Sequence, residues 1–414
     1  MGHRAVLALL LSTASALAAA APSAASASDG AVAPAAGRAF IRVDQLGYAP
    51  FERKIAYLLA PSASPAVEFR VIATDGSTAF TGHAGSNRGA WNAHFSAVHA
   101  LRFSALRAPG VYRLVVESLG VRSAPFRIGT RSELFGPRVA DTVAFFQAQR
   151  DGARVIPGTL DRQPAHLHDR NARLYDWPAY EDPDSDVIVG DSLQRLPGRA
   201  DLEGGWFDAG DFIKFTHTTA YAVTLMLASA RALGGDAPPT LLPEARFGLR
   251  WLRKAWDDRR GVIDFQVGIG SGNQDGTFNG DHDRWRLPEK DDSLTGPENR
   301  YLRHRPAFRA NEPGTRLPPN MAGRMAAAFA LAAQVDAAGD HERAAQELTI
   351  AAGLFAHAKK QHVSEADVVT ALPHAFYPES SWRDDLELAA AELALAGQAL
   401  GDPRSGRWLR ASAR

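Results

Sequence analysis

The sequence predicts a two-part protein in which a small β-sandwich precedes a larger helical domain. Up to about Ile128 the apolar residues occur in short β-branched and aromatic runs separated by turn signals. After about Ser132 they recur at the spacing of helices. The chain has 414 residues, which is long enough for two or three domains.

The N-terminus has the features of a secretory signal peptide. Arg4 places a positive charge before an apolar run, and the small residues Ala25–Ser28 offer a cleavage site. We therefore expect residues 1–28 to be a signal peptide, residues 29–37 to be a disordered lead-in, and the protein to be secreted. A membrane anchor is the alternative, but the apolar run is short and no second run of spanning length follows it.

The composition excludes several classes of function. The formal net charge is zero, so there is no electrostatic case for binding nucleic acid or an anionic membrane surface. The chain contains no cysteine, which excludes disulfides, thiolate metal sites and a cysteine nucleophile. Hydrophobic residues make up 45% of the chain and charged residues 22%, which is typical of a globular protein.

Residues 38–129 are predicted to form an all-β sandwich. The runs FIRV, KIAYLLA, AVEFRVIA and VYRLVVE are strand-like, and TDGS, SNRG and APG between them are turn signals. Roughly seven short strands in a stretch of this length suit two packed antiparallel sheets. The alternative is one edge sheet of a larger domain, but the change of composition near Gly129 favours a separate domain.

Residues 132–414 are predicted to be mainly helical. Wholly apolar and amphipathic runs alternate, which indicates antiparallel hairpins with one helix inside and one outside. The polar, proline-containing stretch Gly152–Glu203 is too long for an ordinary connector, so we interpret it as an ordered, functional loop. The predicted helices are Arg138–Asp151, Thr219–Leu233, Leu241–Trp256, Asn320–Gly339, Asp340–Lys360 and Ser381–Leu400.

The stretch GGWFDAGDFIKF places Asp208 and Asp211 three residues apart among glycines and aromatic residues. The glycines permit a tight turn and a close approach to a ligand. Two neighbouring carboxylates cannot both ionise freely, so we expect one pKa to be raised, and such a pair can hold and deprotonate a water molecule. The flanking aromatic rings offer flat faces for sugar rings.

Other interpretations of the aspartate pair remain open at this point. Aspartate is a favoured helix cap, so capping of the helix predicted from Thr219 explains the spacing equally well. Calcium binding is less well supported, because the pair offers only two carboxylates and large rings surround it.

Several stretches resemble the family 9 glycoside hydrolases. GGWFDAGDFIKF is similar to the signature of that family, and IRVDQLGYAP (Ile41–Pro50) is similar to the start of the immunoglobulin-like domain that precedes many bacterial members. QVGIGSGNQDGTFNGDHDRWRLPE, PPNMAGRMAAAFALAAQV and YPESSWRDDLELAAAELALA resemble later segments in the order of the family. The resemblance therefore covers nearly all of the chain after the predicted signal peptide.

The resemblance implies an (α/α)6 barrel that hydrolyses β-linked glucans of the cellulose type by an inverting single displacement. In such a reaction a general base and a general acid stand about 6.5–9.5 Å apart. By position, Asp211 would be the general base, and Asp208 would hold the water and tune that base. For His282 a hydrogen-bonded structural role is an equal alternative. The candidate substrate-binding residues are Trp206, Phe207, His282 and Trp285.

The general acid of the family, a glutamate in an N–E motif, is not found after Asp211. The one NE pair, Asn311–Glu312, lies too early in the chain. Only about six helices are readable, whereas the barrel needs twelve. We therefore expect the catalytic domain, residues 132–414, to be C-terminally incomplete with about half of the barrel present, and residues 29–414 to show little or no hydrolysis.

The substrate and any bound ion are less well defined. Leu388 and Glu392 stand where many cellulases carry tryptophans, which weakens the case for cellulose itself. Exo-hydrolysis of short β-linked or amino-sugar oligosaccharides and a non-catalytic carbohydrate-binding remnant are the alternatives. No cofactor is expected to be required. The resemblance makes calcium a possible structural ion, with oxygen atoms available in Glu181–Asp186 and Asp275–Asp283, but solvated surface acids are an equal interpretation.

Overall fold

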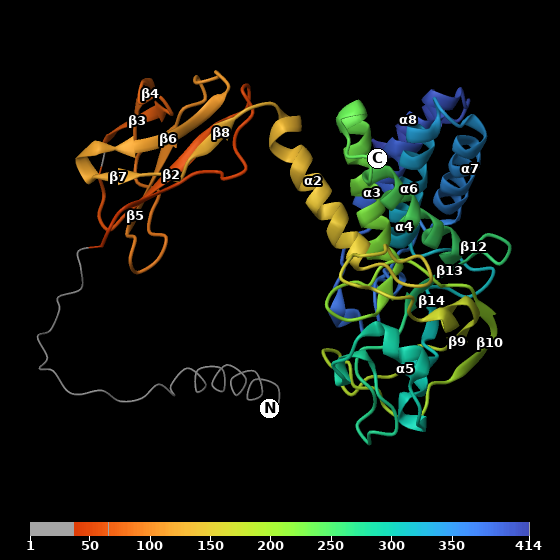
Figure 1. Cartoon of the computed structure of the whole chain (residues 1–414). Helices are drawn as coiled ribbons and strands as arrows, with labels where there is room; N and C mark the ends of the chain where they lie inside the picture. Colours follow the sequence, from red (N-terminus) through yellow and green to blue (C-terminus); the bar gives the residue numbers. More distant parts are fainter. Residues whose placement is uncertain (1–36, 65, 414) are drawn as a thin grey trace, which may run out of the picture. The chain divides into compact units, whose positions relative to one another are not determined.

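The computed structural model describes residues 37–64 and 66–413. The predicted signal peptide and nearly all of the predicted lead-in lie outside the described residues. The chain divides into two compact units, with the boundary between Gly129 and Thr130 (Figure 1). None of the helices in the described part of the chain is long and apolar enough to cross a membrane.

The first unit consists of two antiparallel sheets, which confirms the predicted β-sandwich. One sheet has the strand order β1-β2-β5, and the other has the order β4-β3-β6-β7 with β8 paired to β6. Leu58, Phe69 and Leu114 are among the side chains buried in its core. The strands are β1 (Phe40–Arg42), β2 (Ile55–Ala60), β3 (Glu68–Ala73), β4 (Thr78–His83), β5 (Ala97–Arg102), β6 (Gly110–Val116), β7 (Val121–Arg122) and β8 (Phe126–Ile128).

In the second unit, all the helices predicted from the sequence are present, with bounds shifted by a few residues at most ends. The largest shift is in the first helix, which begins at Arg131 because Thr130 and Glu133 form a capping box there. The helices are α2 (Arg131–Ala148), α3 (Thr216–Leu233), α4 (Leu241–Ala255), α5 (Arg300–Arg303), α6 (Pro319–Asp336), α7 (His341–His357), α8 (Arg383–Leu400) and α9 (Ser405–Ser412).

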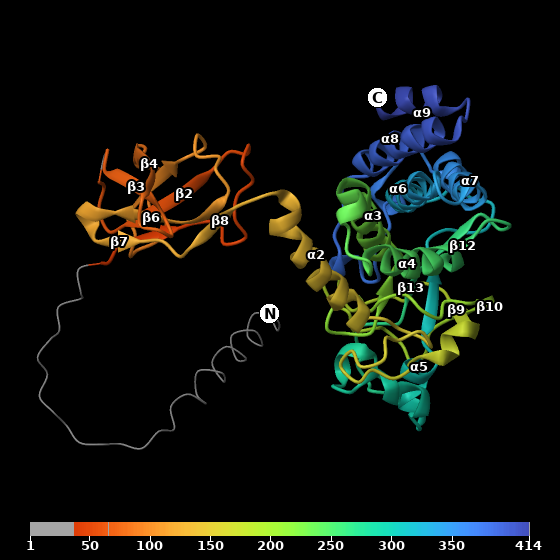
Figure 2. The same cartoon turned by 45° about the horizontal axis from the view of Figure 1, so that its top comes forward.

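Helix α6 is the innermost helix, and it packs against α3, α7 and α8 (Figure 2). Nearly all of its residues are buried, as its almost wholly apolar sequence predicted. Its many alanines allow the neighbouring helices to approach closely. At Gly323 the approach is very close, because an added Cβ would lie 2.6 Å from the backbone carbonyl carbon of Asp385 in α8.

The second unit also contains a mixed sheet, which corrects the prediction of an all-α domain. The strand order is β10-β9-β14-β13-β11, with β12 paired to β13, and Figure 1 shows β9, β10, β13 and β14 below the long helices α6, α7 and α8. All six residues of β13 are buried, so this strand has no polar–apolar alternation to reveal it. The strands are β9 (Ala172–Tyr175), β10 (Arg195–Ala200), β11 (Lys214–Phe215), β12 (Trp256–Asp257), β13 (Val262–Val267) and β14 (Pro306–Arg309).

Substitution of Gly248 by alanine measures how tightly the side chains of the second unit pack around α4. A Cβ at Gly248 in α4 would lie 2.2 Å from the ring of Trp206 and 2.7 Å from Val223. We expect Gly248→Ala to destabilise the second unit by about 1–3 kcal/mol, as overpacking does, measured by chemical denaturation. The matched control is Gly353→Ala in α7, where nothing lies within 4 Å of the added Cβ. That change should stabilise the helix by up to about 1 kcal/mol, and equal effects of the two substitutions would contradict the packing argument.

Candidate active site

The loop that carries Asp208 and Asp211 is held at both ends by backbone pairing. At its start, the Phe207 amide donates to Gln149 at 2.9 Å, and the Asp151 amide donates to Gly205 at 2.9 Å. At its end, Lys214 in β11 pairs with Val267 in β13. Gly205 has a φ of +79°, and a Cβ there would lie 2.8 Å from the Trp251 ring, so this position favours glycine.

Beneath the loop lies a group of interacting charged side chains, which we call the buried charge cluster. Lys214 is fully buried and forms ion pairs with Asp151 at 2.7 Å and Asp169 at 3.0 Å. Arg305 pairs with the same two carboxylates. Burial of so many charges is tolerated only because each has an opposite charge in contact. The cluster consists of Asp151, His166, Asp169, Lys214, Asp281, Arg286, Asp291 and Arg305.

The buried charge cluster fixes Phe212, the residue next to Asp211. The Asp281 carboxylate accepts a hydrogen bond from the Phe212 amide at 2.6 Å, and Arg305 donates to its carbonyl oxygen. The Arg286 guanidinium lies 5.0 Å from the centroid of the Phe212 ring. The position of Asp211 is therefore set by both backbone groups of its neighbour.

The cluster is balanced in charge when His166 is protonated. Its four carboxylates face three permanent cations, Lys214, Arg286 and Arg305. His166 lies 2.9 Å from Asp151 through Nδ1 and 3.0 Å from Asp291 through Nε2, so both nitrogens can donate. Burial and Arg305 oppose a charge on this imidazole, but the two carboxylates outweigh them and raise its pKa.

The carboxyl group of Asp208 is largely buried. Burial raises the pKa of its carboxyl group, and the charge of Asp211 raises it further, while hydrogen bonds from Tyr377 and Thr218 act in the opposite direction. One pKa of the pair is thus raised, as expected, but burial rather than the neighbouring carboxylate is its main cause. The capping interpretation is excluded, because α3 begins after Phe215 and has no side-chain cap.

Asp211 lies beside His282. Its Oδ1 accepts a hydrogen bond from the Ile213 amide at 3.0 Å, and its Oδ2 lies 3.3 Å from Nε2 of His282. Nδ1 of His282 lies 2.8 Å from Asp186. The hydrogen bonds to Asp186 and Asp211 raise the pKa of His282 to about 10, so a positive charge faces Asp211 at neutral pH.

Gly270 leaves space for the contact between His282 and Asp186. A Cβ at Gly270 would lie 2.7 Å from Oδ2 of Asp186 and 2.7 Å from the Phe376 ring. The sequence left two roles open for His282, a residue of the cleft or a hydrogen-bonded structural histidine. Its imidazole is hydrogen-bonded on both sides, yet about a third of the side chain stays exposed beside Asp211.

The four predicted substrate-binding residues differ in how far they are exposed. Trp206 is only 3% exposed, and its indole nitrogen donates to Glu244 at 2.8 Å. Phe207 is also buried, with its ring against His166. Neither ring offers a face to a sugar, which corrects the prediction for both. Trp285, in contrast, is 95% exposed. The sequence showed aromatic residues around the loop but not which of them turn inward.

Two residues of the site were missed by the sequence analysis. Tyr377, which donates to Asp208, follows it by 169 residues, and Asp186 was considered only as part of an acidic cluster. Tyr377 lies between two segments that line a cavity of about 870 Å³, Val368–His374 and Pro378–Ser380. Trp177 and Tyr180 from the long polar loop also line it, so this part of the loop adjoins the site.

In the two segments considered for calcium, three carboxylates already have partners in the structure, and calcium binding there stays a prediction. Asp186 in the first segment is engaged by the positively charged His282. In the second segment, Asp281 binds Arg286 and the Phe212 amide, and Asp283 accepts from the amides of Gly272 and Gly280. No group of three or more histidine, aspartate or glutamate side chains in the described residues is arranged to hold a metal ion.

Two models of known protein families match the sequence of this chain. The model of glycosyl hydrolase family 9 matches residues 135–404, and the model of the cellulase N-terminal Ig-like domain matches residues 37–121.

Curated relatives include Endoglucanase C of Cellulomonas fimi, which is 30% identical over 245 residues that make up 51% of this chain and 20% of that protein. Endoglucanase 14 of Arabidopsis thaliana is 32% identical over 274 residues, 64% of this chain and 46% of that protein. The chain thus matches less than half the length of these relatives.

Among solved structures, a metagenome-derived glycoside hydrolase family 9 endoglucanase has the same fold, with a TM-score of 0.56 and 22% sequence identity. The similarity covers 91% of this chain and 64% of that chain. AaCel9A in complex with cellobiose-like isofagomine gives the same TM-score at 20% identity, over 90% of this chain and 61% of that chain.

The contact between His282 and Asp186 predicts a pH dependence. Because the pKa of His282 is raised, its charge stabilises the folded state fully below the unfolded pKa of about 6.5, and this contribution is lost as the pH rises through about 10. Asp186→Asn removes the largest cause of the shift, so the imidazole pKa should fall and the loss should occur at lower pH. An NMR titration of the imidazole measures the pKa directly.

The control for this titration is Asp184→Asn, an exposed position two residues away, which should leave the pKa of His282 unchanged. Equal pKa values in the two variants would show that Asp186 does not hold the charge on His282.

Proposed function

Because this chain belongs to glycosyl hydrolase family 9, we propose that it is part of a secreted enzyme that cleaves β-linked glucan chains of the cellulose type. The observation that carries the proposal is the aspartate pair, in which Asp208 and Asp211 share one loop but differ in environment. The similarity to proteins named endoglucanases supports the substrate class. The apolar run and small-residue cleavage site at the N-terminus support secretion.

In the proposed reaction Asp211 is the general base. A water molecule held between Asp211 and Asp208 loses its proton to Asp211 as its oxygen attacks the anomeric carbon. The attack comes from the face opposite the leaving sugar, so the configuration is inverted. The Ile213 amide and His282 orient the Asp211 carboxylate, while Tyr377 orients Asp208.

The glycosidic oxygen must receive a proton as it leaves, and a separate carboxylic acid supplies it in an inverting reaction. We assign this role to no residue of the chain. Glu312, the glutamate of the one NE pair, follows strand β14, and its backbone carbonyl accepts hydrogen bonds from Asn311 and Thr315 in a local turn. The part of the mechanism that these residues can carry out is therefore base catalysis and positioning of the water.

A substrate that needs no acid tests this division of roles. Fluoride leaves β-cellobiosyl fluoride without a proton, so a site that has only the base can still hydrolyse it. We expect the chain to release fluoride and to form the α-anomer of cellobiose first, seen by proton NMR. Asp211→Asn should lower the rate about 100-fold or more, since a positioned base contributes at least that much.

Asp236→Asn is the matched control, because Asp236 is an exposed aspartate in the short 3₁₀ helix that follows α3, and it should not change the rate. Fluoride release that is equally fast in Asp211→Asn would overturn the assignment of the base, and a β-anomer as first product would overturn inversion. Retained binding of cello-oligosaccharides without any fluoride release would instead support a non-catalytic carbohydrate-binding protein.

The same protein can be used to test whether the chain contains a general acid. Residues 29–414 should release few or no reducing ends from carboxymethyl cellulose while they hydrolyse the fluoride. Comparable turnover of both substrates would show that the chain contains its own general acid.

A further inference from the structure

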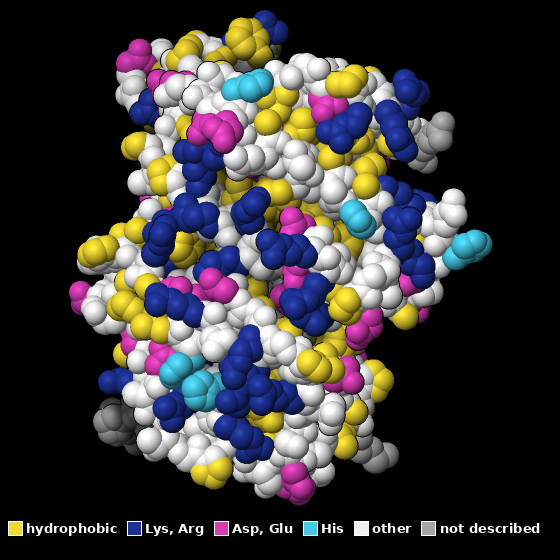
Figure 3. All heavy atoms as spheres, turned by 90° about the vertical axis from the view of Figure 1, so that its right-hand side faces the viewer, with side chains coloured by type: hydrophobic (Ala, Val, Ile, Leu, Met, Phe, Trp, Pro, Cys, Tyr) yellow, Lys and Arg dark blue, Asp and Glu magenta, His cyan; other side chains and the backbone are white. Residues whose placement is uncertain are grey.

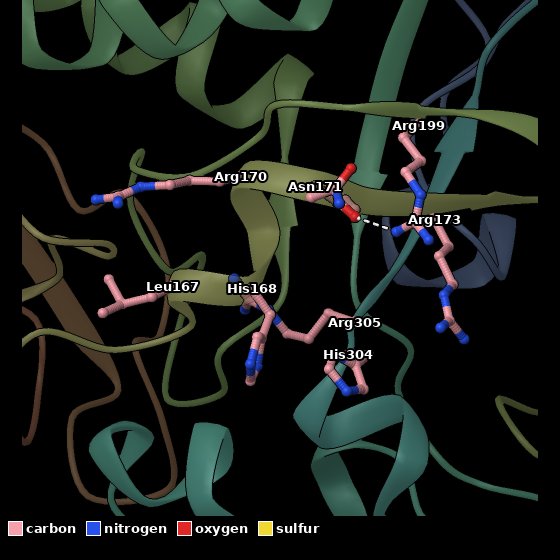
Figure 4. Close-up of a pocket in the computed structure, with 9 residues that line it drawn as sticks. Leu167, His168, Arg170, Asn171, Arg173, Arg199, His304 and Arg305 are labelled. Carbon is pink, nitrogen blue, oxygen red and sulfur yellow. Dashed lines mark hydrogen bonds between the residues drawn. The ribbon is translucent and has the colours of Figure 1, made fainter.

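A second cavity, of about 230 Å³, is surrounded by positively charged side chains. It lies among the 3₁₀ helix Leu167–Asn171, strands β9 and β10, and the segment that joins α5 to β14. Figure 4 shows Arg173 and Arg199 side by side at one end, with His168 and His304 near each other. On the face that carries β9 and β10, lysine and arginine side chains gather beside a pair of histidines (Figure 3).

Two arginines of this cavity have no opposite charge. Arg173 in β9 and Arg199 in β10 are directly opposite each other in the antiparallel pair, an arrangement in which like charges are destabilising. Neither forms an ion pair with any residue in the described part of the chain. Arg199 donates to the backbone carbonyl of Asn171 at 3.0 Å, and Arg173 is hydrogen-bonded to the side chain of Tyr175.

The other two arginines of the cavity, Arg170 and Arg305, do have carboxylate partners. Arg170 pairs with Glu203 at 2.7 Å and points away from Arg173 and Arg199 in Figure 4. Arg305 is neutralised by the carboxylates of the buried charge cluster. The uncompensated positive charge is therefore confined to Arg173 and Arg199.

Two histidines, His168 and His304, also line the cavity. Their ring centroids lie 4.4 Å apart. His168 is fixed by Arg303 and Asp292, whereas no hydrogen bond joins the His304 ring to another described residue. Burial lowers the pKa of His304, and electrostatic interactions with His168, Arg303 and Arg173 lower it further, so an anion placed here would relieve the repulsion.

We propose that this cavity binds a tetrahedral oxyanion, phosphate or sulfate, either free or as an ester on a sugar. The planar guanidinium groups of Arg173 and Arg199 each present paired N–H donors that match two oxygens of such a group. The imidazole of His304 supplies a further donor across the cavity when protonated. A tetrahedral oxyanion has enough oxygens to accept from all three side chains at once.

The test measures binding of inorganic phosphate to the full chain by isothermal titration calorimetry at constant ionic strength. We expect saturable binding to one site, and a dissociation constant raised about tenfold or more by Arg173→Gln or Arg199→Gln, because each removes charged hydrogen bonds. Arg195→Gln is the matched control. Arg195 is an exposed arginine of β10, the strand that also carries Arg199, but it does not line the cavity.

A second measurement separates binding from folding. Without phosphate, Arg173→Gln should melt at the same or a higher temperature than the parent chain, because the repulsion with Arg199 is removed, and phosphate should no longer raise the melting temperature. A structural role for Arg173 would instead lower the melting temperature of the free protein and leave the effect of phosphate in place.

A sugar phosphate ester distinguishes the two sources of the anion. Tighter binding of glucose 6-phosphate than of phosphate would identify an esterified sugar as the ligand, and the reverse order would identify the free ion. Absence of saturable binding, or equal weakening in Arg195→Gln and Arg173→Gln, would overturn the proposal.

Discussion

The candidate active site depends on the buried charge cluster beneath its loop. Eight ionisable side chains meet there, and they come from five separate segments between Asp151 and Arg305. Removing one partner from such a buried arrangement costs about 3–5 kcal/mol, whereas the intact arrangement adds little net stability over a packed apolar core. The contribution of the cluster is positional, since it fixes both backbone groups of Phe212 and with them the direction of Asp211.

The two aspartates acquire different characters because different neighbours surround them. Asp208 is buried and hydrogen-bonded by Tyr377 and Thr218, and its pKa is raised. Asp211 has the positively charged His282 beside it and remains partly exposed. A short loop thus places two chemically identical side chains three residues apart, and tertiary contacts make them unlike.

Local patterns of the sequence predicted a large part of this structure. The alanine-rich run of α6 indicated an innermost helix, and the glycines around the aspartates indicated a tight loop, because both features depend on nearby residues. Strand β13 was missed since every residue is buried. Trp206 is buried against Glu244, and Tyr377 contacts Asp208. Both contacts join residues distant in sequence, so no local pattern encodes them.

The span of the buried charge cluster has a consequence for the order of folding. The loop is complete in sequence at Phe215, yet its supporting partners extend to Asp291 and Arg305, and Tyr377 follows later still. In a chain synthesised from the N-terminus, Asp211 therefore waits for more than a quarter of the sequence to emerge before its surroundings exist. Contacts of such separation slow folding, so we expect the surroundings of this loop to form later than contacts between neighbouring elements.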